Sequence, residues 1–261
     1  MADKGIIFSA AMVRALLDGA KTQTRRLLKP APPEWCANDR PGYSALTPKG
    51  HIEFRGWWPG SETEKGGYGS KFIKLPYAPG DRLYVREAHY FNHYEYADQR
   101  TPKERPADLT DEYLCYRATE DDCEIQNEAR WRPSIHMPRW ASRLWLEVTE
   151  VRVQRLHEIS DEDARAEGTI YTEFGHDEPR GEASLDGGRT WHKMAGMKHP
   201  GWHFLPVSGP SECFRFPTNA FANLWGHLHT TEGERWEDNP WIVAVSFNVH
   251  RGNIDGVATN G

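Results

Sequence analysis

Apolar side chains recur at helical spacing in two short segments of the chain. The first segment is bounded by Ser9, a residue that can cap the start of a helix, and by Gly19, which can adopt the left-handed conformation that ends one. The second segment runs from Thr218 to Leu228. Apolar positions three and four residues apart predict amphipathic helices in both segments, and the aromatic residues of the second are expected in the core.

Alternating apolar positions predict strands elsewhere in the chain. Leu144 and Val148 share one phase of alternation, whereas Val151 and Val153 share the opposite phase. This change of phase predicts a bulge near 149–150. Residues 241–249 are apolar on both faces, which is typical of a buried strand.

A short acidic helix is predicted between these strands. Ser160 is suited to its N-cap and Gly168 to its end, so that Glu167 falls in the last turn. A carboxylate at that end opposes the helix macrodipole by a few tenths of a kcal/mol up to about 1 kcal/mol. A cation is therefore expected beside it, and Lys21 is the candidate.

Three long segments separate the regular elements. Segments 30–78, 88–138 and 169–217 are rich in glycine, proline or charge and show little periodicity, so we expect mostly irregular insertions. Strands lie near both ends of the chain, which favours a single domain over 1–250. The small, polar residues 251–261 are expected to form a flexible tail.

Composition narrows the class of protein. The chain has 261 residues and a formal net charge of −6, which argues against a protein that coats nucleic acid by bulk electrostatics but leaves a local basic cleft open. No apolar run approaches the roughly 20 residues that span a bilayer. No signal-peptide pattern precedes the strand-like residues 6–8. We therefore expect a cytoplasmic protein without a membrane partner.

The cysteines and histidines do not form a recognisable metal site. The cysteines are far apart and lack a C-x-x-C pair, so they are expected to be free thiols: Cys36, Cys115, Cys123 and Cys213. Pairs of histidines occur, but without a carboxylate in a known ligand pattern. We expect neither a metal ion nor a cofactor.

The segment Gly19 to Arg26 concentrates reactive groups directly after the first helix. As an extended strand it would place Thr22, Thr24 and Arg26 on one face, with Lys21, Gln23 and Arg25 on the other. Lys21 could then reach Thr24 only at a twist, a bulge or the strand's first residue, or through its long stem. A solvated surface turn is the alternative interpretation.

This segment resembles the G-x-K-T-x-T-x-R signature of ASCH domains, which belong to the PUA-like superfamily. Four further pieces resemble the family in order: 80–85, 144–153, 156–168 and 241–247. The resemblance implies an α+β fold, a PUA-like β-barrel with flanking short helices. Long versions of this kind resemble proteins encoded by bacteriophages and prophages.

Within this family, one group of small enzymes hydrolyses the exocyclic amide of N(4)-acetylcytidine. Their catalytic lysine, threonine and glutamate match Lys21, Thr24 and Glu167, so the resemblance implies a metal-independent amidohydrolase acting on this or a related modified cytosine nucleoside. Glu158 and Glu162 are alternative counterparts of the glutamate. The implied partner is therefore a small nucleoside.

Chemistry supports this assignment without deciding the mechanism. An amide needs an activated oxygen nucleophile and a proton for its leaving nitrogen. Thr24 can supply the oxygen, with Lys21 as its activator and Glu167 as a proton shuttle through an acyl-enzyme. Alternatively, Lys21 stays a cation that stabilises the oxyanion, while Glu167 handles protons for threonine or water.

Two residues are candidates for substrate binding. Arg26 belongs to the signature and could orient the carbonyl of a base. Glu87 follows a predicted strand where a loop would open into the barrel mouth. A surface ion pair with Arg82 or Arg86 is the alternative for Glu87.

Two other functions remain open from the sequence. PUA-like barrels often bind RNA, and an RNA-binding module or ribonuclease would use basic side chains that could line one groove: Arg25, Arg26, Lys29, Arg139, Arg143, Arg152 and Arg155. A reader that inserts a flipped modified base into a pocket is the third hypothesis. The sequence leaves the oligomeric state undetermined.

Overall fold

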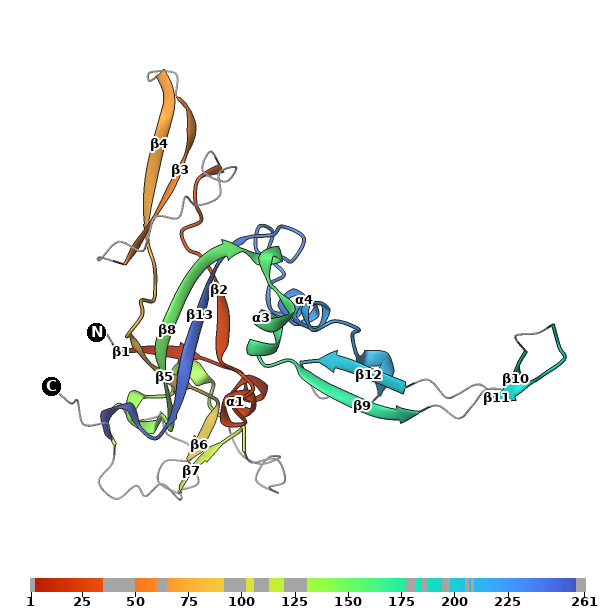
Figure 1. The fold of residues 1–261 in the computed structure, drawn as a ribbon. Coiled ribbons are helices and arrows are strands. Elements are labelled where there is room, and N and C mark those ends of the chain that lie inside the picture. The colour runs from red at the N-terminus through yellow and green to blue at the C-terminus, as the bar shows by residue number, and fades with distance from the viewer. Residues whose placement is uncertain are drawn as a thin grey trace.

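The computed structural model combines several strands with a few short helices (Figure 1). It describes residues 3–34, 50–60, 65–91, 102–105, 113–119, 131–176, 182–184, 187–193, 198–204, 207 and 209–256. The expected α+β class is therefore confirmed at this level. None of the helices in these ranges is both long enough and apolar enough to cross a membrane.

A five-stranded sheet forms the centre of the molecule in the order β1-β5-β8-β13-β2. Its strands are β1 (Asp3–Ile7), β5 (Arg82–Arg86), β8 (Leu144–Arg155), β13 (Trp241–Arg251) and β2 (Gln23–Leu27). β1 pairs with β5 in parallel, whereas the other neighbours are antiparallel. The first and last strands of the sheet thus come from the same N-terminal segment of the chain.

The predicted bulge lies in β8. Ser246 of β13 faces Glu150, whereas the next residue, Phe247, faces Val148. Thr149 is therefore the extra residue, and the apolar phase changes there as the sequence pattern indicates. The prediction of a bulge at 149–150 is confirmed.

The helices begin and end at the predicted signals. α1 (Ala10–Leu17) is capped by Ser9, and α3 (Asp161–Ala166) by Ser160, each through a side-chain oxygen that accepts a backbone N–H. α4 (Pro217–Leu228) buries Phe221, Leu224 and Trp225 of its apolar stripe, whereas Leu228 at its end is exposed. Short 3-10 turns occupy Ser134–His136, Arg139–Ala141, Leu156–Glu158, Pro210–Glu212 and Ile254–Gly256.

Two apolar clusters lie on the sheet. The larger joins α1 to β1, β5, β8 and β13, with Leu83, Leu146 and Val245 among its fully buried members. The smaller packs α3 and α4 against β13 and the 3-10 turn after β8, through residues such as Leu156, Phe221 and Ile242. α3 is thereby held close to β2, which lies beside β13.

The closed barrel implied by the resemblance is not seen among the described residues, whose sheet is open. Its edge strands β1 and β2 do not pair, but a side chain links them: Arg26 Nη2 donates a hydrogen bond to the carbonyl oxygen of Ile7 at 2.7 Å. α1 connects the same two strands in the chain (Figure 1).

The insertions contain more regular structure than expected. In segment 30–78, β3 (His51–Gly60) and β4 (Lys65–Lys74) form a long hairpin, so the expectation of mostly loop is wrong there. The hairpin is anchored by Ile52, Phe54 and Ile73, which are buried in the larger cluster. Glycines in β4 hide this alternation, because they add no apolar position to the pattern.

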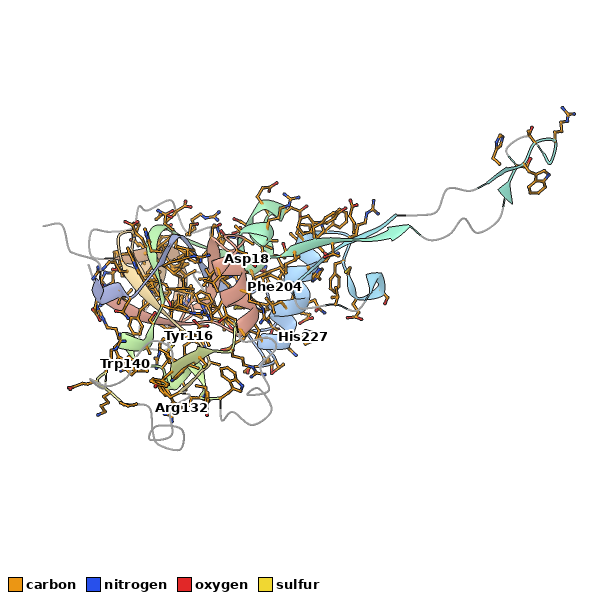
Figure 2. The ribbon with its side chains drawn as sticks, turned by 90° about the horizontal axis from the view of Figure 1, so that it is seen from below. Asp18, Tyr116, Arg132, Trp140, Phe204 and His227 are labelled. Atoms are coloured by element: carbon orange, nitrogen blue, oxygen red, sulfur yellow. The ribbon has the colours of Figure 1, made fainter. Side chains whose placement is uncertain are left out.

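The other two insertions also contain paired strands. β6 (His89–Phe91) pairs with β7 (Leu114–Tyr116), and β9 (Ile170–His176) pairs with β12 (Lys198–His203). A further pair, β10 (Glu182–Ala183) and β11 (His192–Lys193), lies far beyond the β9–β12 hairpin in both views (Figure 1, Figure 2). These insertions were likewise expected to be irregular.

The start of the C-terminal segment is docked rather than flexible. The side-chain amide of Asn253 donates to the carbonyl oxygens of Arg139, Trp140 and Ser142, and Ile254 is fully buried. The flexible tail expected from residue 251 is therefore wrong as far as residue 256. Residues 257–261 lie outside the described ranges.

Candidate active site

Lys21 sits where the chain passes from α1 into β2. Its backbone N–H donates to the carbonyl of Ala15, and that of Thr22 donates to the carbonyl of Ala166 at the end of α3. Two helices therefore fix the backbone of this short segment. Thr22 is exposed, whereas the Lys21 side chain is fully buried.

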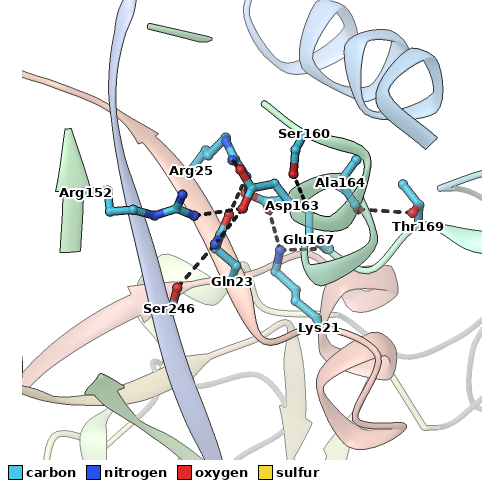
Figure 3. Close-up of polar contacts among 10 residues, drawn as sticks. All are labelled: Lys21, Gln23, Arg25, Arg152, Ser160, Asp163, Ala164, Glu167, Thr169 and Ser246. Carbon is cyan, nitrogen blue, oxygen red and sulfur yellow. Dashed lines mark hydrogen bonds and ion pairs between the residues drawn. The ribbon is translucent and has the colours of Figure 1, made fainter. Parts of the chain in front are cut away.

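Glu167 is the C-cap of α3, and its side chain meets Lys21. Lys21 Nζ lies 2.8 Å from Glu167 Oε2 and donates a second hydrogen bond, also 2.8 Å, to the backbone carbonyl of the same residue (Figure 3). The two residues are 146 positions apart in the chain. The cation expected beside Glu167 is thus confirmed as Lys21.

The alternative glutamates do not take this place. Glu158 Oε2 accepts a hydrogen bond from the backbone N–H of Arg155, and Glu162 lies exposed beside Arg165. Of the three acidic candidates, Glu167 is the one that pairs with Lys21.

Gly168 allows the close approach of these elements. Its φ is +100°, and a Cβ built there would lie 3.0 Å from Ala15 Cβ and 3.2 Å from Lys21 Cβ. A side chain at this position would therefore meet both strain and crowding. Gly168, which the sequence predicts to end the helix, thus also allows the end of α3 to lie against Lys21.

Burial sets the electrostatics of the pair. Loss of hydration lowers the pKa of Lys21 below its ordinary value, and the Glu167 carboxylate opposes this effect. The nearby guanidinium groups of Arg26 and Arg25 lower the Lys21 pKa further. The pKa of Lys21 is thus lower than that of an exposed lysine, which makes its amine better suited to accept a proton near neutral pH.

Residues on the same face of β2 extend the contacts of Glu167. Arg25 Nη1 lies 3.2 Å from Glu167 Oε1, and Arg25 Nη2 lies 2.7 Å from Asp163 Oδ2. The Gln23 amide donates to Asp163 Oδ1 and Ser246 Oγ, each at 3.2 Å (Figure 3). The predicted sharing of one face is confirmed for Gln23 and Arg25, and Lys21, which precedes β2, contacts the same carboxylate as Arg25. The surface-turn interpretation is wrong for these three residues because all are buried.

Asp163 and Ser246 are members of this cluster that the sequence did not single out as site residues. Asp163 lies one helical turn before Glu167, so the four-residue spacing of the two acids was an available signal. Ser246 lies on β13, in register with Gln23, and only strand pairing brings it there.

Thr24 is buried on the opposite face of β2 from Gln23 and Arg25, in register with Val245. Its hydroxyl makes no hydrogen bond to Lys21 or Glu167 in this structure. Lys21, however, precedes β2 and so is not bound by strand alternation. Its amine lies 5.6 Å from the centre of the Phe8 ring, and the guanidinium of Arg26, which shares a face with Thr24, lies 5.3 Å from the same ring.

Arg26 retains an unsatisfied donor. Its Nη2 donates to the Ile7 carbonyl, but its Nε is buried and has no hydrogen-bond partner within the described ranges. An orphaned buried donor is unfavourable unless a ligand or water completes it. Arg26 is therefore suited to hold an acceptor oxygen.

Glu87 is paired with Arg143 and not with Lys21. Both carboxylate oxygens accept from Arg143, at 2.9 and 3.0 Å, and the side chain is almost completely buried. Burial raises the Glu87 pKa, while the paired Arg143 opposes this shift. The surface ion pair with Arg82 or Arg86 is therefore wrong, and the structure does not bring Glu87 into contact with Lys21 or Glu167.

The arginines proposed for a shared basic groove contact different partners within the protein. Arg139 pairs with Asp3 and Asp255, and Arg152 pairs with Asp163. The Arg155 guanidinium lies 4.5 Å from the centre of the Trp241 ring. Lys29, the lysine of the same set, pairs with Glu234 at 2.7 Å.

The cysteine thiols and potential metal ligands lie apart from one another within the described residues. Among the described residues, neither Cys115 nor Cys213 forms a disulfide, and Cys36 and Cys123 lie outside them. Within the part of the chain that the structure describes, no three His, Cys, Asp or Glu side chains gather closely enough to hold a metal ion.

Comparison of the chain with models of protein families, with curated proteins and with solved structures found no match.

Proposed function

We propose that this protein is a PUA-like ASCH domain and an amidohydrolase that removes an acyl group from the exocyclic amine of N(4)-acetylcytidine or a related modified cytosine nucleoside. The observation that carries the proposal is the buried contact of Lys21 Nζ with Glu167 Oε2 at 2.8 Å. These residues occupy the lysine and glutamate positions that the resemblance implies, and burial lowers the Lys21 pKa toward the range of a general base.

Acylation would begin with the neutral amine of Lys21 taking the proton of the Thr24 hydroxyl. The Thr24 oxygen then attacks the acyl carbon of the substrate, and the carbonyl electrons move to the oxygen as an oxyanion. When this intermediate collapses, the bond to the exocyclic nitrogen breaks and Lys21 returns its proton to that nitrogen. Cytidine leaves, and an ester remains on Thr24.

Deacylation requires a water molecule. Its proton passes to Lys21 or Glu167 while its oxygen attacks the ester carbon, so that acetate leaves and the threonine hydroxyl is restored. In the alternative scheme, water attacks the substrate directly, and Lys21 remains a cation beside the oxyanion. An acid-quenched reaction distinguishes the two, because only the first leaves an acetyl group on the peptide that contains Thr24.

Substrate binding would use the surroundings of Phe8. The orphaned Nε of Arg26 supports a hydrogen bond to the carbonyl oxygen of the base. The Phe8 ring, which lies near both Lys21 and Arg26, supplies an apolar contact.

The test is hydrolysis of N(4)-acetylcytidine by the purified protein, followed as release of cytidine by chromatography. Three variants remove the proposed groups: Lys21→Met, Thr24→Val and Glu167→Gln. Two matched controls, Thr22→Val and Glu162→Gln, change exposed residues of the same segments. Tryptophan fluorescence reports whether each variant is folded.

We expect each site variant to lose at least about a hundredfold in turnover, the usual scale for a general base or nucleophile, and both controls to retain it. A folded wild type without turnover would contradict the proposal. Binding of RNA with a strong dependence on salt would then favour the nucleic-acid-binding alternative.

A further inference from the structure

Arg25 contacts the carboxylate of the Lys21–Glu167 pair, although it lies outside the positions that the signature matches. It is buried on β2, and each of its terminal nitrogens faces a carboxylate of α3. Nη1 lies 3.2 Å from Glu167 Oε1, and Nη2 lies 2.7 Å from Asp163 Oδ2. Nη1 also donates a hydrogen bond to Gln23 Oε1.

The carboxylate of Glu167 is therefore held from both sides. Lys21 donates a hydrogen bond to Oε2, and Arg25 donates one to Oε1 (Figure 3). Arg25 is in turn fixed by Asp163, which also accepts hydrogen bonds from Gln23 and Arg152. The result is a chain of alternating charges in which the Arg25 guanidinium bridges two acids one helical turn apart.

The two cations on Glu167 are not equivalent. An arginine guanidinium keeps its charge in proteins, whereas a buried lysine can lose its proton. If Lys21 were the only partner, deprotonating it would leave Glu167 as an unpaired buried anion, which is strongly unfavourable. A permanent positive charge on the other oxygen removes this difficulty.

We propose that Arg25 is a positioning residue that holds Glu167 as an oriented carboxylate, so that Lys21 can cycle between its charged and neutral forms. The catalytic meaning of this role rests on the proposed function. The electrostatic role stands on the contacts alone and can be measured without a substrate.

The charged groups around the Lys21 amine all bear on its proton affinity. Glu167 faces it from α3, while Arg25 and Arg26 approach from β2. The Phe8 ring closes the side toward β1. Replacing Arg25 by a neutral residue removes a repelling charge and also leaves Glu167 to Lys21 alone. Both effects favour the protonated amine, so the pKa of Lys21 should rise.

The experiment measures the titration of Lys21 directly. Protein labelled with ¹³C at the lysine Cε is titrated by NMR, and the Lys21 signal is identified by its loss in Lys21→Met. Arg25→Met removes the charge, and Arg25→Gln is a second neutral variant in case the first fails to fold. Arg165→Met is the matched control, because it removes an arginine from half-exposed α3 surface beside Glu162.

We expect the Lys21 signal of either folded neutral variant to titrate at higher pH than in the wild type. The Arg165→Met protein should titrate as the wild type does. A folded Arg25 variant with an unchanged Lys21 titration would overturn the proposal.

Turnover provides a separate measurement. If the wild type hydrolyses N(4)-acetylcytidine, Arg25→Met should lower kcat at pH 7 by roughly tenfold or more, move the rising limb of the pH–rate profile to higher pH, and change KM little. Equal loss of kcat at every pH would contradict the positioning role. If the wild type shows no hydrolysis, the proposed function fails, and the NMR titration still decides the role of Arg25.

Discussion

Replacing Glu167 by glutamine should destabilise the protein, because it removes a negative charge that faces a completely buried ammonium group. The Lys21 side chain has no exposed surface, and its amine lies 2.8 Å from the Glu167 carboxylate. Glutamine preserves the shape, and the backbone carbonyl of residue 167 still accepts one hydrogen bond from Lys21. The substitution therefore isolates the charge.

The magnitude follows from two limits. Breaking a buried ion pair by removing one partner costs about 3–5 kcal/mol. Lys21 can also avoid being an unpaired buried cation by losing its proton. From an ordinary pKa of 10.5, this deprotonation costs about 5 kcal/mol at pH 7 and about 2 kcal/mol at pH 9. We expect Glu167→Gln to lower the free energy of unfolding by about 3–5 kcal/mol at pH 7. At pH 9, deprotonation of Lys21 limits this loss to no more than about 2 kcal/mol.

The sign of this pH dependence can be stated for the variant. Without Glu167, the folded state binds the Lys21 proton less tightly than the unfolded state, so stability rises with pH up to the ordinary lysine pKa of 10.5. Urea unfolding followed by tryptophan fluorescence at pH 7 and pH 9 measures both effects. Glu162→Gln, on the exposed face of the same helix, is the control and should cost less than about 0.5 kcal/mol. If the two variants were equally stable at pH 7, the argument from burial would be refuted.

Three further predictions concern the scaffold, each measured by urea unfolding. Gly168→Ala should cost about 1–3 kcal/mol more than Gly252→Ala, because both have a positive φ but only Gly168 meets close neighbours; equal costs would exclude crowding. Burial lowers the pKa of His89 to about 4, so the free energy of unfolding should fall by up to about 3 kcal/mol as pH falls from 6.5 to 4. His89→Gln should lack this loss. Asn253→Ala should cost about 1–3 kcal/mol through its three carbonyl contacts, whereas a flexible tail would show no change.

Local signals were sufficient for the elements that build the site. Ser9 and Ser160 cap their helices as predicted, and the change of apolar phase locates the bulge at Thr149. Caps and bulges depend on residues within one or two turns, so a short window of sequence contains their causes. The same is true of Glu167 at the end of α3.

Pairing between distant segments was not readable in this way. The β3–β4 hairpin was expected to be loop, because its glycines interrupt the apolar pattern and its stability depends on Phe54 packing into the main core. Asn253 and Ile254 lie in a segment that is mostly polar and small, yet the Asn253 amide donates to three carbonyls and Ile254 is fully buried. Glu87 was expected at the mouth of a barrel or in a surface ion pair with Arg82 or Arg86, but its partner is Arg143, which lies 56 positions away.

The sequence by itself determined the reactive groups of the candidate site and the local elements that present them: Lys21 at the end of a capped helix and Glu167 at the C-terminal end of another. Only the tertiary structure decided that these two are in direct contact and that Arg25 and Asp163 extend the charged chain. The physical reason is that burial and charge pairing depend on all the neighbouring groups that β13 and α3 bring together. These neighbours set the proton affinity of Lys21, and a local sequence pattern does not reveal them.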